Sequence, residues 1–168
     1  CDWSSDVCSS DLWNMDKVYR HTGGRGGEGM GYGAPAAVGA ALANRKYGRL
    51  SINIQQDGDL NYAPGILWTA VHHKIPLLNI MHNNRGYHQE VMFLQQQATI
   101  RNRQIDRAHI GTRLIEPNID YAQMAKAYGM YAEGPITDPN ELGPALKRGI
   151  DRVKRGEPVL LDVVTQPR

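Results

Sequence analysis

The sequence is poor in cysteine, and both of its cysteines, Cys1 and Cys8, lie within the first twelve residues. The rest of the chain therefore offers no disulfide, no reactive thiolate and no cysteine-ligated zinc site. It has no apolar run approaching the ~18–20 residues that a membrane-spanning helix needs. It also has no block of like charges of the kind that marks a nucleic-acid-binding surface. We therefore expect neither a membrane nor a nucleic acid among its partners.

Residues 1–12 have no hydrophobic periodicity and lack the basic start and apolar centre of a signal peptide. This stretch resembles the translated read-through of a sequencing adapter, which ends in Ser-Ser-Asp-Leu as residues 9–12 do. We expect residues 1–12 to be a non-native, disordered leader and residues 13–168 to be one domain, a fragment of a larger enzyme. Without the leader, 19 Lys and Arg face 14 Asp and Glu, a mildly basic net charge of +5. A cytoplasmic location is the default expectation.

Glycine is concentrated in residues 23–33, which hold seven glycines in eleven positions. Glycine loses the most backbone entropy on ordering, so we expect a loop here. Pro35 is the expected first residue of an alanine-rich helix that ends at Gly48. The backbone N–H groups of this loop and of the helix start could meet a diphosphate.

Beyond the loop, the spacing of apolar residues switches between strand and helix periods. Strands are expected over residues 50–55, 75–81, 130–132 and 158–164, and helices over 62–73, 88–98, 118–128 and 142–155. We expect Asn118 to cap the third of these helices and residues 99–117 to be irregular. Alternating strands and helices predict an α/β fold: an open, doubly wound, mostly parallel sheet with helices on both faces.

Two of the expected strands end in polar residues that suit a metal ion. Asp57 follows the first strand and Asn84 follows the second, 27 positions later. Ligands of open α/β sheets bind beyond the carboxyl ends of the strands, so the two side chains could face each other there. Mg²⁺ prefers oxygen ligands in an octahedron. The Asp57 carboxylate, the Asn84 amide oxygen and the Gly86 carbonyl would supply three.

Two other interpretations carry less weight. The glycine loop contains a GxGxxG pattern, but no strand precedes it, which disfavours a dinucleotide site. Four histidines invite a zinc hypothesis, but adjacent histidines on a helix point apart, and no carboxylate-histidine spacing supports a site. These histidines are His72, His73, His82 and His88.

The Asp-Gly pair at residues 57–58 and the Asn-Asn pair at residues 83–84 resemble the signature of thiamine diphosphate enzymes. That signature reads Gly-Asp-Gly, a spacer and then Asn-Asn. Residues 29–40 also resemble this family, most closely its acetolactate synthase-like branch. There the segment reads Met-Gly-(Phe/Tyr)-Gly-Leu-Pro-Ala-Ala-Ile-Gly-Ala. The resemblance runs from about His21 to the end of the chain. It implies the thiamine diphosphate-binding fold and, within it, the C-terminal diphosphate-binding domain.

The resemblance also implies roles for individual residues. Asp57, Asn84 and the Gly86 carbonyl match the ligands of Mg²⁺. Met30 matches the bulky residue beneath the cofactor, which folds its two rings into a V so that the cofactor can deprotonate itself. The carbonyl of Glu28 matches the acceptor for the cofactor's amino group. The further cofactor-binding residues implied are Gly29, Gly31, Gly58, Asp59 and Tyr87.

The sequence departs from the family at Gln56, where the motif has glycine, and at Asp59, where serine or alanine is usual. A second carboxylate near a diphosphate would be repulsive unless it points away or helps the metal. The stretch after Asn-Asn, residues 85–90, also differs from acetolactate synthases, so the substrate does not follow from the branch. Weaker candidates near the site are His88 and Gln89 for substrate contact, Tyr32 for packing on the cofactor, and His21 for the rim.

The implied activity is that of a lyase or transferase acting on a 2-keto acid, as a decarboxylase or carboligase. The family's catalytic glutamate belongs to another domain, supplied across a subunit interface, so no catalytic residue is expected within this chain. We therefore expect a half-site that binds thiamine diphosphate and Mg²⁺ and needs a second subunit, as in a dimer. The alternative is a non-catalytic assembly or regulatory domain of the same fold.

Overall fold

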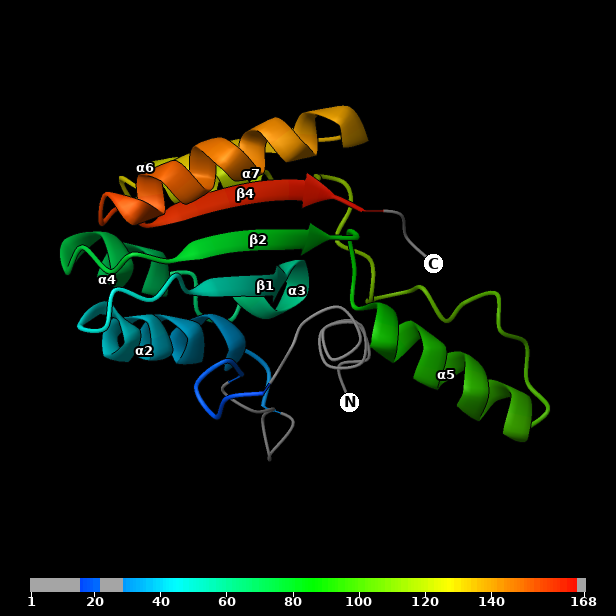
Figure 1. Ribbon diagram of the computed structural model, residues 1–168. Helices are drawn as coiled ribbons and strands as arrows, with labels where there is room; N and C mark the ends of the chain where they lie inside the picture. The colour runs from blue at the N-terminus through cyan, green and yellow to red at the C-terminus, as the bar shows by residue number, and fades with distance from the viewer. Residues whose placement is uncertain (1–15, 22–28, 166–168) are drawn as a thin grey trace.

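The computed structural model describes residues 16–21 and 29–165. It contains four strands: β1 (Ile52–Gln56), β2 (Leu78–Asn83), β3 (Tyr131–Ile136) and β4 (Val159–Val164). They form one parallel sheet in the order β1-β2-β4-β3 (Figure 1). The predicted α/β class and parallel sheet are confirmed. The predicted leader lies outside the described residues and stays a prediction.

Among the described residues, five helices and one short helical turn connect and cover the strands. The helices are α2 (Gly33–Arg45), α4 (Ile66–His72), α5 (His88–Ile100), α6 (Tyr121–Ala127) and α7 (Pro139–Lys154), and the helical turn α3 (Asp57–Leu60) directly follows β1.

 Apart from α5, these segments pack against the sheet or beside it. No helix among the described residues is both long and apolar enough to cross a membrane.

Two clusters of buried apolar side chains lie on the two faces of the sheet. The first brings together α2, α4 and α6 with side chains such as Met81 on β2 and Leu160 on β4. The second packs α7 against Leu78, Val159 and Leu161 on the same two strands. Because neighbouring strand residues point to opposite faces, each central strand contributes to both clusters. The prediction of helices on both faces is therefore confirmed.

The edge strand β1 buries its polar face. Ser51 and Gln55 are buried beneath α2, whereas Leu50 and Ile54 on the other face are 43% and 45% exposed. The predicted alternation is present, but α7 packs mainly on β2, β3 and β4, and on the apolar face of β1 only Ile52 packs against the cluster that α7 forms. This face of the strand is therefore only partly covered in the described part of the chain, at Ile52.

Several predicted helix boundaries were wrong. Helix α4 begins at Ile66 and not at residue 62, and α7 begins at Pro139 and not at residue 142. Helix α2 begins at Gly33 and not at Pro35, which takes the third helical position. Proline is tolerated there because the first-turn N–H groups have no partner within the helix. Helix α6 begins at Tyr121, and its cap is Asp120 and not Asn118: the Asp120 carboxylate accepts a hydrogen bond from the Gln123 N–H at 2.7 Å.

Helix α5 differs from the others because none of its residues is buried. It projects away from the carboxyl ends of the strands, and a long irregular segment leads back from it to α6 (Figure 1). The predicted helix over 88–98 and the predicted irregular segment after it are confirmed. The side of the molecule beyond the strand ends is therefore framed by α3, α5 and the turn after β2.

Candidate functional site

The turns that follow β1 and β2 are joined through Asp57, which is 2% exposed. Its Oδ1 accepts a hydrogen bond from the N–H of Gly58 at 2.8 Å, and its Oδ2 accepts one from the N–H of Gly86 at 3.1 Å. The second bond crosses 29 positions of sequence. The two strand ends that carry the predicted metal ligands are therefore in direct contact, because β1 and β2 are neighbouring parallel strands.

Burial raises the pKa of the Asp57 carboxyl above its ordinary value, and the N–H groups of Gly58 and Gly86 oppose that rise. A carboxylate removed from water is disfavoured unless something compensates for its charge. The backbone donors compensate in part. A bound cation would complete the compensation.

The two asparagines at the end of β2 have different surroundings. Asn83 is buried and donates from its side-chain amide to Oδ1 of Asp162 at 2.9 Å. In Asn84, the amide oxygen Oδ1 is buried and accepts no hydrogen bond from the residues that the structure describes. A buried acceptor without a donor is costly, and such groups are rare in folded proteins. Asn84 thus presents an oxygen that still requires a partner.

The turn after Asn84 is held by a short antiparallel bridge between Gly86 and Arg113. The N–H of Leu114 donates to the Arg85 carbonyl at 2.8 Å, and the N–H of Tyr87 donates to the Thr112 carbonyl at 2.7 Å. These two hydrogen bonds use the Arg85 carbonyl and the Tyr87 N–H, on either side of Gly86, and do not involve the Gly86 carbonyl. The irregular segment before α6 therefore fixes the turn that carries the third predicted ligand.

Tyr87 lies against the turn after β1. A Cβ atom on Gly58 would overlap the Tyr87 ring, and the Tyr87 hydroxyl donates to the Gly58 carbonyl at 3.4 Å. The Tyr62 ring meets the Tyr87 ring edge to face, with 6.4 Å between the centroids. Burial raises the pKa of Tyr87 to about 12, so the hydroxyl keeps its proton at neutral pH. Gly58 is required here because any side chain would displace this ring.

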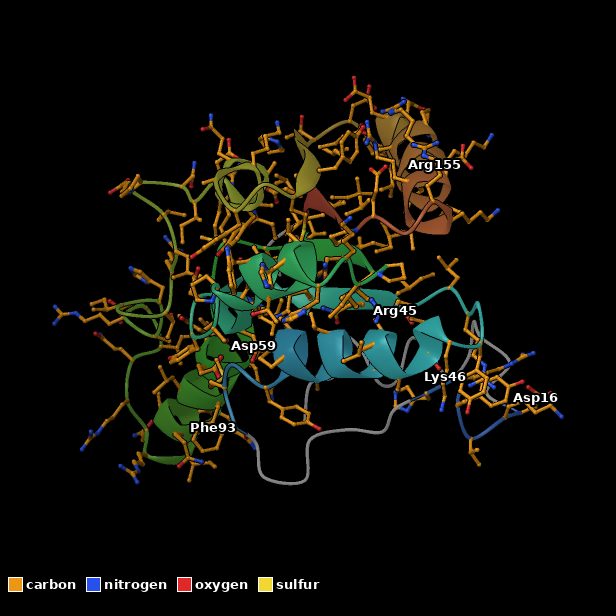
Figure 2. The ribbon with its side chains drawn as sticks, turned by 90° about the vertical axis from the view of Figure 1, so that its left-hand side faces the viewer. Asp16, Arg45, Lys46, Asp59, Phe93 and Arg155 are labelled. Atoms are coloured by element: carbon orange, nitrogen blue, oxygen red, sulfur yellow. The ribbon has the colours of Figure 1, made fainter. Side chains whose placement is uncertain are left out.

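Asp59 is directed at the glycine turn before α2. It is 3% exposed; its Oδ1 accepts from the N–H of Gly31 at 2.7 Å and its Oδ2 accepts from the N–H of Gly33 at 3.2 Å. Figure 2 shows Asp59 at the N-terminal end of α2. The expectation that these N–H groups face a diphosphate is therefore wrong for Gly31 and Gly33, because a carboxylate of the chain itself already accepts from them.

The remaining sequence candidates are less closely tied to these turns. Met30 is 36% exposed and Tyr32 is 52% exposed, and Gly29, His21 and Gln89 are exposed as well. His72 stacks on Trp68 on α4 with 4.7 Å between the ring centroids. Among the described residues, no three His, Cys, Asp or Glu side chains form a group that could hold a metal ion. Glu28 and the GxGxxG residues before Gly29 lie outside the described residues.

Sequence reasoning missed two residues that support the site. Tyr121 donates its hydroxyl to the Asp57 carbonyl at 3.0 Å, and Asp162 accepts from the N–H of Tyr121 at 3.1 Å. Burial is the main reason that the pKa values of both Tyr121 and Asp162 are raised. The signal for Asp162 was available: it is the one charged residue inside an otherwise apolar strand, β4.

The chain is similar in sequence to a known protein family and to known proteins. The family model for the C-terminal TPP binding domain of thiamine pyrophosphate enzymes matches residues 6–163. Benzoylformate decarboxylase of Pseudomonas aeruginosa is 33% identical over 138 residues, which cover 82% of this chain and 23% of that protein. The "Probable acetolactate synthase large subunit" of Methanocaldococcus jannaschii is 29% identical over 171 residues, which cover 98% of this chain and 26% of that protein.

A solved structure has the same fold. The thiamine diphosphate-dependent 4-hydroxybenzoylformate decarboxylase of Rhodococcus jostii aligns with a TM-score of 0.66 and 30% sequence identity, over 82% of this chain and 23% of that one. This chain thus spans about a quarter of the length of the curated relatives it matches, 23% and 26%. From the family match and the shared fold, the chain belongs to the thiamine pyrophosphate enzymes and corresponds to their C-terminal, TPP-binding domain.

Proposed function

We propose that this chain binds Mg²⁺ through the Asp57 carboxylate, the Asn84 amide oxygen and the Gly86 carbonyl, and thiamine diphosphate beside it. The observation that carries the proposal is the contact between the two turns, 3.1 Å from Oδ2 of Asp57 to the N–H of Gly86. It brings the turn with the buried carboxylate against the turn with the buried Asn84 oxygen that lacks a donor.

The chemistry of these groups fits Mg²⁺. A hard cation of this size takes oxygen ligands, usually one or two from carboxylates, with phosphate oxygens and water completing the octahedron. Asp57 has lone pairs left after the two backbone bonds, Asn84 has a bare oxygen, and Gly86 has a carbonyl outside the neighbouring backbone pairing. A bound cation would also offset the free-energy cost of burying the ionised Asp57 carboxylate.

We assign the rest of the predicted cofactor site in two groups. Gly29, Met30 and Gly31 would lie beneath the rings, with Met30, already partly exposed, as the supporting side chain. Gly58 and Tyr87 would line the diphosphate side, where the absence of a Gly58 side chain lets the Tyr87 ring approach. Asp59 would act from behind the glycine turn and not as a direct phosphate contact, since its oxygens accept from Gly31 and Gly33.

The reaction class we propose is decarboxylation or carboligation of a 2-keto acid. When bound, thiamine diphosphate supplies a carbon nucleophile that attacks the keto carbon and stabilises the charge left by the loss of CO₂. The residues of this chain would hold the diphosphate and the metal and set the position of the rings. Because the chain spans about a quarter of its relatives, we propose a half-site that needs a second domain or subunit for turnover.

Calorimetry tests the proposal directly. Thiamine diphosphate titrated into the 168-residue chain with Mg²⁺ should give a binding isotherm, and Asp57→Ala should abolish it. Asp138→Asn is the matched control, because Asp138 is exposed and its carboxylate caps α7 by accepting hydrogen bonds from Asn140. A folded, unaltered chain that gives no heat would sink the proposal and favour a non-catalytic assembly role for this fold.

A further inference from the structure

Asp59 anchors the glycine turn that precedes α2 to the end of β1. Its two carboxylate oxygens accept from different N–H groups of the turn, Oδ1 from Gly31 at 2.7 Å and Oδ2 from Gly33 at 3.2 Å. A carboxylate at a helix N-terminus is stabilised both by these donors and by the helix dipole. The acid comes from 26 to 28 positions away in sequence, so it caps α2 from outside the helix.

Asp59 is itself held by polar side chains that cross the sheet. Gln55 donates from Nε2 to Oδ2 of Asp59 at 2.8 Å and accepts at Oε1 from Asn53 at 3.0 Å. Asn53 also donates to Asn79 on β2 at 3.1 Å, and Asn79 donates to the Val159 carbonyl on β4 at 3.3 Å. Because Oε1 of Gln55 accepts a hydrogen bond from Asn53, the side-chain amino group of Gln55 must face Asp59. The carboxylate is therefore fixed relative to three strands.

The glycine turn is shaped to receive this carboxylate. A Cβ atom on Gly33 would lie 2.8 Å from Oδ2 of Asp59, closer than such contacts allow. Gly31 has a φ of +83°, and a Cβ atom there would lie 2.7 Å from the Cβ of Tyr62. Any larger residue at either position would push the turn away from Asp59. The turn and the acid thus form one matched unit.

We propose that Asp59 is a positioning residue for Met30. The N–H of Gly31 belongs to the peptide bond that joins Met30 to Gly31, so the 2.7 Å bond to Asp59 sets the orientation of that peptide and of the Met30 side chain. This inference rests on the proposed function, in which Met30 supports the cofactor rings. Asp59 then acts on the thiamine half of the cofactor and leaves the metal and the diphosphate to other residues.

The test compares two ligands in the presence of Mg²⁺: thiamine diphosphate, which has the rings, and inorganic pyrophosphate, which lacks them. Asp59→Asn keeps the shape of the side chain but can accept at one oxygen only, so one donor of the turn loses its partner. We expect affinity for thiamine diphosphate to fall about tenfold, or ~1.4 kcal/mol, and affinity for pyrophosphate to change by less than about twofold.

A double-mutant cycle shows whether Asp59 acts through Met30. Met30→Ala should also lower the affinity for thiamine diphosphate and leave that for pyrophosphate nearly unchanged. In the Met30→Ala background, Asp59→Asn should lower the affinity for thiamine diphosphate little further. Asp138→Asn, which changes the cap of α7, should leave both affinities unchanged. Equal losses for the two ligands, no loss for either, or fully additive losses in the double variant would each overturn the proposal.

A separate measurement keeps the inference distinct from the proposed function. If the unaltered chain binds neither ligand, the proposed function fails, and with it the role of Asp59 in positioning a cofactor. Amide hydrogen exchange at Gly31 and Gly33 then shows whether the structural part holds, because Asp59→Asn should speed exchange at the amide that loses its acceptor and Asp138→Asn should speed exchange at neither. Unchanged exchange in Asp59→Asn would show that the carboxylate does not hold the turn.

Discussion

The side-chain amide of Asn83, the last residue of β2, donates to the carboxylate of Asp162 on β4 at 2.9 Å. The other oxygen of the same carboxylate accepts from the N–H of Tyr121 at 3.1 Å, where α6 begins. Tyr121 in turn donates its hydroxyl to the carbonyl of Asp57. Asp162 therefore links both turns of the proposed metal site, one through Asn83 and the other through Tyr121, without belonging to either.

We predict that Asp162→Asn destabilises the fold and weakens Mg²⁺ binding. Both oxygens of the fully buried carboxylate accept from N–H donors, and an asparagine can accept at only one of these positions. Leaving a buried donor without an acceptor costs about 1–3 kcal/mol. Urea denaturation measures the loss, and calorimetry measures the metal affinity. Asp138→Asn at the exposed cap of α7 serves as control, and equal stability of the two variants would contradict the prediction.

A second prediction concerns pH and follows from the raised pKa of Asp57. Because burial raises this pKa above 3.8, the native state holds the proton more tightly than the unfolded chain does. The contribution of Asp57 to stability is therefore retained at low pH and falls as the pH rises through the window above 3.8. A bound cation favours the ionised form, so Mg²⁺ should reduce this fall.

Comparison with Asp57→Asn isolates the contribution of this one carboxyl from those of other titrating groups. The free energy of unfolding of the unaltered chain, relative to that of Asp57→Asn, should increase as the pH falls from about 7 to about 4. Denaturation curves at several pH values, with and without Mg²⁺, measure it. A difference that is independent of pH would show that the pKa of Asp57 is not raised by burial.

A third prediction concerns the contact of Gly58 with Tyr87. Gly58→Ala places a methyl group where the Tyr87 ring lies, so the ring must move. Overpacking of this kind costs about 1–3 kcal/mol. Tyr87→Leu removes the ring, and Gly58→Ala should therefore cost much less in the Tyr87→Leu background. Thermal or urea unfolding of the four proteins completes the cycle, and additive effects would mean that the two residues do not compete for the same space.

The sequence predicted the sheet and the turns after β1 and β2, because these depend on local patterns: alternating periods, strand lengths and turn residues. It did not predict that Ser51 and Gln55 would be the buried side of β1, since that depends on which helices cover the strand. It also did not predict the hydrogen bonds that join Asp59 to the start of α2, because two of its donors are the backbone N–H groups of Gly31 and Gly33, which are distant in sequence. Long-range hydrogen bonds of this kind leave no periodic signal in the sequence.

The last prediction concerns α5, whose Met92, Phe93 and Leu94 are 53%, 57% and 43% exposed. Figure 2 shows Phe93 on this helix, which stands apart from the sheet. Exposed apolar side chains on a helix with no buried residue favour association, and burying a side chain such as phenylalanine contributes roughly 1.5–3 kcal/mol. We therefore expect the 168-residue chain to form dimers or larger assemblies.

Phe93→Glu should shift the chain toward the monomer, because a charge within such a contact is costly to bury. Tyr47→Glu is the matched control: Tyr47 is a 59% exposed aromatic residue just after α2 and receives the same charge. Light scattering over a range of concentrations measures the mass of each protein. A monomeric unaltered chain, or an equal effect of the two substitutions, would show that α5 does not mediate the association.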